Sequence, residues 1–145
     1  MAYLTFLWID GVRGASQDTH HLGDIDVLSY SFGEVGAIQA SAASGGGQLQ
    51  SKASSHDFTF WKKIDGASAQ LWNAWHTGHR FPTMILSLEK DVGGRSSGEL
   101  LRYVMRDVVI MDLRPGGLSR TGGDDSPTEE IGVSFASIDT RYKKD

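Results

Sequence analysis

The sequence predicts a mainly β domain, a two-sheet antiparallel β-barrel with one short flanking α-helix (about residues 68–77) and a long extended loop over 36–50. Apolar residues alternate with polar ones in several short segments, which is typical of strands with one packed face. Only one segment repeats its apolar residues at helical spacing. Turns are abundant, with 18 glycines and only 3 prolines in 145 residues. This length suits a single domain spanning 1–145.

Composition and charge exclude several classes of function. The chain has no cysteine, which rules out thiol nucleophiles and cysteine-ligated metals. Its formal net charge is −4 and its basic residues are scattered, so we expect no nucleic-acid partner. No apolar run reaches the roughly 20 residues of a membrane-spanning helix, so we expect no membrane insertion.

The first strand is expected over residues 1–9, and its two faces are both apolar. One face carries Tyr3, Thr5, Leu7 and Ile9, and the other carries Leu4, Phe6 and Trp8. A strand with one wet face would not place large apolar residues on both sides. Either the domain covers both faces, or one face contacts another subunit.

Further strands are expected over 24–33, 55–64 and 81–90, and 99–113 is long enough for two strands or one bent strand. In the 24–33 segment, Leu28, Tyr30 and Phe32 are expected on one packed face, and Ser29, Ser31 and Gly33 on the other. The last strand changes its apolar parity near Ala136, which indicates a β-bulge or a change of packing partner.

The helical segment has apolar residues at i, i+3 and i+4, with Ser68 as a candidate N-cap and Gly78 as a left-handed stop. We expect it to cover one end of the barrel. The segment 36–50 is rich in Ala, Ser and Gly, and is longer than most connections in a compact domain.

No residue pattern supports catalysis, so we expect no enzyme, no cofactor and no metal. His76 and His79 have a spacing that could hold zinc, but the segment offers no third ligand. His56 and Asp57 are adjacent in an expected strand and point to opposite faces, so they cannot act as a base and its carboxylate. A stand-alone ligand-binding or hydrolytic β-barrel that uses the tryptophans, or His76 and His79, remains the alternative.

Five motifs in order resemble the Hcp family, the haemolysin-coregulated tube proteins of bacterial type VI secretion systems. They are the turn Gly11–Ser16, the strand motif Ile25–Gly33, the Gly-rich loop, the segment His56–Leu71 with His56-Asp57-Phe58-Thr59-Phe60 and Lys62-Lys63-Ile64-Asp65, and the closing Pro127-Thr128-Glu129-Glu130-Ile131 strand. A phage-like tail-tube protein would share this architecture and is a further alternative.

The resemblance implies that the whole of 1–145 is one Hcp-like tube domain, which forms hexameric rings that stack into a hollow tube. The implied partners are other copies of this chain, the contractile sheath and spike proteins of the apparatus, and small effector proteins in the lumen. The implied location is the bacterial cytoplasm during assembly, followed by secretion through the apparatus without a signal peptide.

Candidate site residues follow from this expectation. The candidate subunit interface is Leu4, Phe6, Trp8 and Trp61, and the candidate lumen or cargo-facing residues are Ser29 and Ser31. The candidate ring-stacking loop is represented by Ser41, Ser44, Gly45, Gly46, Gly47 and Gln48.

Overall fold

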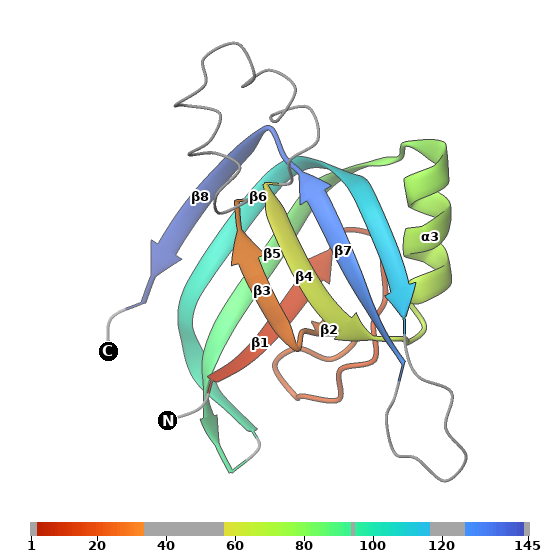
Figure 1. Ribbon diagram of the computed structural model, residues 1–145. Helices are drawn as coiled ribbons and strands as arrows, with labels where there is room; N and C mark the ends of the chain where they lie inside the picture. Colours follow the sequence, from red (N-terminus) through yellow and green to blue (C-terminus); the bar gives the residue numbers. More distant parts are fainter. Residues whose placement is uncertain (1–2, 34–56, 94, 117–126, 144–145) are drawn as a thin grey trace, which may run out of the picture.

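A computed structural model describes residues 3–33, 57–93, 95–116 and 127–143 (Figure 1). The strands are β1 (Tyr3–Ile9), β2 (Ile25–Asp26), β3 (Ser29–Phe32), β4 (Phe58–Lys63), β5 (Arg80–Val92), β6 (Arg95–Gly116), β7 (Thr128–Ser134) and β8 (Ser137–Tyr142). The helix is α3 (Ser68–Thr77). The mainly β class with one short helix at 68–77 is confirmed, whereas the loop over 36–50 lies outside the described residues.

The strands form one continuous, curled antiparallel sheet rather than two separate ones. Its order is β2-β1-β5-β6-β7-β4-β3, and β8 adds to β6 beside β7. The edge strands β2 and β3 do not pair with each other, so the hydrogen-bonded ladder is not closed in the described chain. Most strands that lie side by side in the sheet are far apart in the sequence, and all of the pairs in the described chain are antiparallel. Such pairing is typical of barrel-like β domains.

The two edges are joined by the chain itself. Residues 24–33, expected as one strand, divide into β2 on β1 and β3 on β4, with Val27 and Leu28 between them. The Val27 N–H donates to Thr5 O at 3.0 Å, and the Leu28 N–H donates to Trp61 O at 2.8 Å. The chain therefore crosses from one edge of the sheet to the other at these two residues. Their hydrogen bonds to β1 and β4 stabilise the curvature of the sheet.

β6 is one long bent strand, and its inward face changes parity twice. Met111 is the extra residue at a register shift opposite β7, and it is exposed. At Asp107 the backbone has φ 57, and this position lies opposite the break between β7 and β8. The parity change predicted near Ala136 is thus a paired irregularity in which both neighbouring strands shift together.

The core lies inside the curl and is contributed by every long strand. Its completely buried members include Leu7, Ile25, Phe58, Phe60, Leu71, Met84, Leu86, Met105, Val108, Ile131 and Val133. Tyr30 and Phe32 pack against this cluster, whereas Ser29 and Ser31 on the same strand are exposed. The alternation predicted for the second strand is therefore present within β3. Leu28, also predicted on the packed face, is 54% exposed because it lies in the crossing between β2 and β3.

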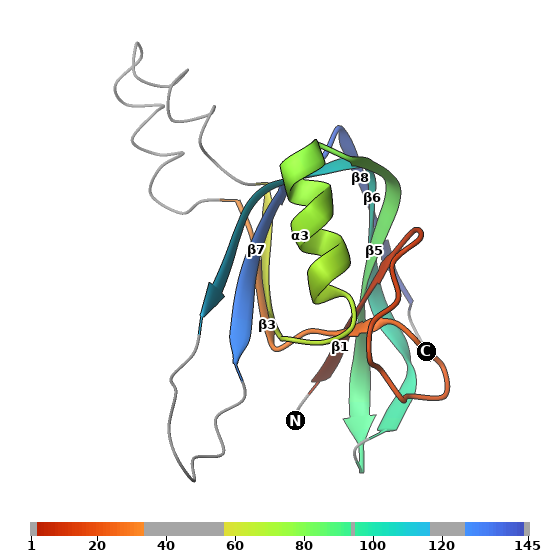
Figure 2. The ribbon, with the colours of Figure 1, turned by 90° about the vertical axis from the view of Figure 1, so that its right-hand side faces the viewer.

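The helix lies on the open side of the curled sheet, between β7 and β5 (Figure 2). Leu71 and Ala74 point into the core. Gly78 ends the helix in the predicted left-handed conformation, with φ 68. In the described part of the chain, no helix is long and apolar enough to cross a membrane.

The predicted N-cap is wrong by one residue. The helix begins after Ala67, which makes no side-chain cap, and Ser68 is already helical. The Ser68 hydroxyl instead accepts a hydrogen bond from Asp65 N at 2.9 Å and donates one to Glu129 at 2.6 Å. The buried Glu129 carboxylate needs hydrogen-bond donors, and the Ser68 hydroxyl serves this carboxylate instead of capping the helix.

Candidate assembly surface

The outer face of β1 is covered in one part and open in another. Phe6 is only 4% exposed, because the ring of His21 stacks on it with centroids 4.3 Å apart and planes at 6°. Trp8, two residues further along the same face, remains 38% exposed. Leu4 is partly buried. The first of the two arrangements considered for this strand, a cover within the domain, thus holds for Phe6, whereas Trp8 has no such cover among the described residues.

The cover over Phe6 is the segment between β1 and β2, which we call the 13–24 loop. Backbone hydrogen bonds connect its two ends, from Gly14 N to Gly23 O at 2.7 Å and from Ser16 N to Asp24 O at 2.9 Å. A Cβ at Gly14 would lie 2.5 Å from Asp24 O, so only glycine permits this approach. The glycine in the turn motif is explained by backbone contact.

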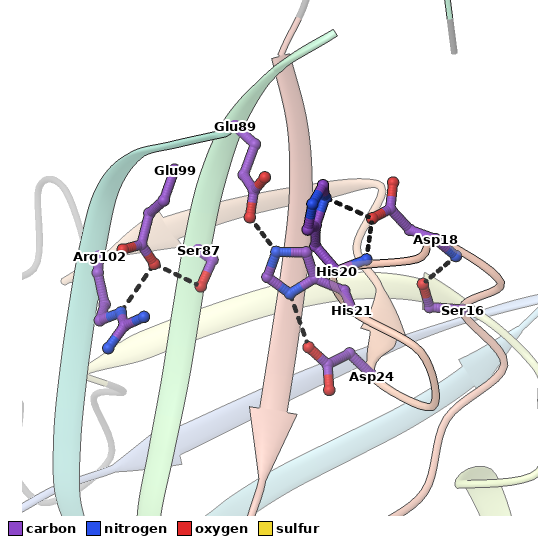
Figure 3. A network of polar contacts seen from close by, with 9 residues as sticks. All are labelled: Ser16, Asp18, His20, His21, Asp24, Ser87, Glu89, Glu99 and Arg102. Atoms are coloured by element: carbon purple, nitrogen blue, oxygen red, sulfur yellow. Dashed lines mark hydrogen bonds and ion pairs between the residues drawn. The ribbon is translucent and has the colours of Figure 1, made fainter. Parts of the chain in front are cut away.

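His21 fastens the loop to the sheet (Figure 3). Its Nδ1 lies 2.9 Å from an Asp24 carboxylate oxygen, and its Nε2 contacts the Glu89 carboxylate on β5. The His21 and Asp24 side chains are 12% and 14% exposed, and Glu89 is 3% exposed. The residues around His21 in the sequence give no signal for this contact, because Glu89 is 68 residues away.

Burial and the mutual contacts of His21 and Asp24 shift the pKa of both groups. Burial lowers the pKa of His21, but the hydrogen bonds and charges of Glu89 and Asp24 outweigh it and raise the pKa above its ordinary value of 6.5. Burial raises the pKa of the Asp24 carboxyl, and His21 partly opposes that rise. Burial likewise raises the pKa of Asp26, the last residue of β2.

A second polar group lies beside the first on the same face (Figure 3). Glu99 on β6 is the cross-strand partner of Glu89. The Arg102 guanidinium donates to Glu99 at 2.7 Å, and Ser87 donates to the same oxygen at 3.3 Å. The two neighbouring glutamates therefore have different cationic partners, His21 for Glu89 and Arg102 for Glu99.

Ser29 and Ser31 lie on the outer face of the β3–β4 pair. Ser29 is the cross-strand partner of Trp61, and Ser31 is the partner of Thr59. Trp61 in turn pairs with Glu130 on β7. The structure thus places Trp61 beside a candidate lumen residue and on a strand that does not pair with β1. This outer face combines small hydroxyl side chains, one partly buried tryptophan and a carboxylate.

Sequence analysis did not single out β8, although the parity change at Ala136 pointed to it. In the described residues β8 pairs only with β6, and all six of its residues are exposed. Ile138 is the cross-strand neighbour of the fully buried Met105, so its side of β8 continues the core face of the sheet. Ile138 and Tyr142 are 38% and 67% exposed because no described segment covers this extension.

The remaining candidate residues from the sequence lie outside these polar clusters. The candidate ring-stacking residues Ser41, Ser44, Gly45, Gly46, Gly47 and Gln48 lie outside the described residues. His76 bonds to Trp72 O at the end of α3 and packs on Trp72 and Trp75. His79 packs on Phe81 instead. Within the described residues, no three His, Asp or Glu side chains converge as metal ligands would.

Comparison with known proteins identifies the family. Residues 6–142 match a family described as "Type VI secretion system effector, Hcp". The chain is 32% identical to "Protein hcp1" of Pseudomonas aeruginosa over 143 residues, covering 99% of this chain and 85% of that protein.

Solved structures have the same fold. The crystal structure of Hcp1 from Salmonella typhimurium has a TM-score of 0.76 and 28% sequence identity, covering 99% of this chain and 88% of that one. The crystal structure of a type VI secretion system effector from Yersinia pestis has a TM-score of 0.71 and 28% identity, covering 95% and 88%. The match thus holds over almost the whole chain in both sequence and structure, and the chain belongs to the Hcp family of secreted type VI secretion tube proteins.

Proposed function

We propose that this chain is a structural subunit of the type VI inner tube, forming hexameric rings that stack into a hollow secreted tube. The domain that does so is the whole of 1–145. Family membership supports the general role. The observation that favours self-association is β8, which continues the core face of the sheet without a cover and has one edge free in the described chain.

The free edge of β8 has the groups that another strand needs. The Lys143 N–H donates to Leu100 O at 2.9 Å, and hydrogen-bonded positions alternate along an antiparallel ladder. The N–H groups of Ile138, Thr140 and Tyr142 therefore point away from β6. An open edge of this kind is a template for pairing with a second chain, and a repeated contact between unlike surfaces forms a ring when the rotation between subunits closes.

Two other surfaces contribute to the proposed assembly. Trp8 and Leu4 on β1, with Trp61 on β4, supply apolar contacts between subunits, whereas Phe6 already has its cover within the subunit. Ser29 and Ser31 face the lumen, where small polar side chains suit water and small effector proteins. The outside of the tube faces the sheath, and its end meets the spike.

The role is structural and not catalytic. A stand-alone hydrolytic or ligand-binding barrel would require convergent groups around a substrate, and the residue clusters described above are each occupied by intramolecular partners. A phage-like tail-tube protein would assemble in the same way, so it differs from this proposal in setting rather than in mechanism.

Imaging tests the proposal directly. Purified protein at increasing concentration is examined by negative-stain electron microscopy and by light scattering coupled to gel filtration. We expect six-fold rings with a central hole and a mass of six subunits. Monomers alone at every concentration would overturn the proposal. A stoichiometric metal or glycan in the purified monomer would favour the stand-alone barrel instead.

A further inference from the structure

We propose that His21 is a pH-dependent latch, which holds the 13–24 loop over Phe6 when its imidazole is protonated and releases the loop when the imidazole is neutral. The inference concerns the free subunit and does not depend on ring assembly. It starts from the contacts of the two ring nitrogens, each of which faces a carboxylate (Figure 3).

The closed loop requires a proton on each ring nitrogen of His21. Ionised carboxylates only accept hydrogen bonds, so the bonds to Asp24 and Glu89 require an N–H on both Nδ1 and Nε2. Only the imidazolium has both. A neutral ring has one N–H, and its other nitrogen would then direct a lone pair at a carboxylate. The closed arrangement is thus the arrangement of the protonated ring.

The carboxylate of Glu89 is buried and needs a cation beside it. Glu89 is 3% exposed, and His21 is the cation that contacts it. Its cross-strand neighbour Glu99 is also acidic, and the nearby Arg102 is bonded to that residue. A neutral His21 would leave Glu89 as a buried charge beside a second carboxylate. Because an unpaired buried charge is strongly unfavourable, the neutral state favours opening of the loop and hydration of Glu89.

Among the ion pairs of the described residues, Glu89 has His21 as its cation. β1 presents only the Phe6 ring, which the imidazolium covers face to face. The other charged groups on the elements around His21 include Arg13, Asp18 and His20 in the loop, Asp26 on β2, Lys90 and Asp91 on β5, and Glu99 with Arg102 on β6. Arg13 runs beside Gly23, and His20 lies near Asp18 with a 65% exposed side chain. Acidic groups therefore outnumber the cations that remain when His21 loses its proton.

Opening has a defined structural consequence. Backbone hydrogen bonds connect the two arms of the loop, and His21 provides a buried side-chain contact from the loop to β5. When that contact is lost, the two arms of the loop separate and their mutual backbone hydrogen bonds open to solvent. Phe6 then becomes exposed between Leu4 and Trp8 on the outer face of β1. The latch therefore controls how much continuous apolar surface this strand presents.

Amide exchange and histidine titration on the full chain test the latch. Imidazole signals are assigned with His21→Gln and His20→Gln variants, and protection factors are measured by NMR for the amides of Gly14, Ser16 and Gly23. We expect His21 to titrate above 6.5, and the loop protection factors to fall about tenfold per pH unit between 6.5 and that value. The helix amide of Leu71 is the internal reference and should keep its protection.

A matched variant separates the latch from a merely structural histidine. In Glu89→Gln, the new amide can donate to the lone pair of a neutral His21 while Nδ1–H still donates to Asp24. We expect this variant to keep the loop closed at high pH and to lose most of the pH dependence, and His20→Gln to behave as the wild type. Loop protection that is independent of pH in the wild type, or a His21 pKa below 6.5, would overturn the latch. So would an unchanged pH dependence in Glu89→Gln.

Discussion

The ammonium group of Lys62 lies 2.6 Å from a carboxylate oxygen of Glu129, and both side chains are buried, at 0% and 2% exposure. Lys62 also contacts Asp65 at 2.7 Å. The pair joins β4, β7 and the start of α3, because Ser68 donates to the same glutamate oxygen. This ion pair therefore fixes the helix against the sheet at the point where the chain leaves β4.

Replacing Lys62 by methionine should destabilise the domain by about 3–5 kcal/mol, because Glu129 would remain as a buried charge without its cation. Urea unfolding followed by tryptophan fluorescence measures the loss. The double variant Lys62→Met with Glu129→Leu removes both charges and should recover more than half of it. A single variant as stable as the wild type would contradict this account of the pair.

Replacing Gly14 by alanine should cost about 1–3 kcal/mol, because the new Cβ would lie 2.5 Å from Asp24 O and force the backbone of the loop apart. Gly66→Ala is the matched control: its Cβ meets nothing within 4 Å, and its φ is not positive. That control should stay within about 0.5 kcal/mol of the wild type. Thermal unfolding compares the two, and equal losses would argue against a specific clash at Gly14.

The strands were predictable from the sequence because their signal is local. The alternation of Ser29 and Ser31 with Tyr30 and Phe32 follows from the pleat of the chain and needs no tertiary information. Gly78 was predictable for the same reason, since its role depends on its own backbone conformation.

The contacts that build the candidate surface depend on pairing between distant segments. Nothing near His21 in the chain indicates Glu89, which is brought to it by the antiparallel pairing of β1 with β5. The cover over Phe6 was missed for this reason, and only the apolar second face of the strand hinted at it. Ser68 was misassigned as a cap because its real partner, Glu129, is 61 residues away.

The stability of the domain should depend on pH through His21. Its pKa in the folded protein is raised above 6.5, so its contribution is fully present below 6.5 and is lost as the pH rises through the folded-state value. The difference in unfolding free energy between the wild type and His21→Gln should thus be largest in mildly acidic solution and shrink at higher pH. Urea titrations at a series of pH values measure it, and a difference that grows with pH would contradict the sign.

Replacing Thr140 by proline should prevent ring assembly without unfolding the subunit. The Thr140 N–H points to the free edge of β8, so proline removes a donor that β6 does not use. Circular dichroism should show a folded monomer, and electron microscopy should show few or no rings. Thr140→Ala keeps the N–H and should assemble normally. Normal rings from the proline variant would exclude pairing through this edge.

Replacing Trp8 by aspartate should weaken ring assembly if the open part of the β1 face is buried between subunits. A carboxylate enclosed there without a partner is unfavourable, so the concentration needed for assembly should rise by at least about tenfold, on the order of 1.4 kcal/mol. Trp72→Asp is a matched control, because Trp72 on α3 is 41% exposed and lies on a different surface. Sedimentation velocity over a concentration series distinguishes the two variants. If both assemble like the wild type, Trp8 faces solvent in the ring and the subunit contact lies with β8 alone.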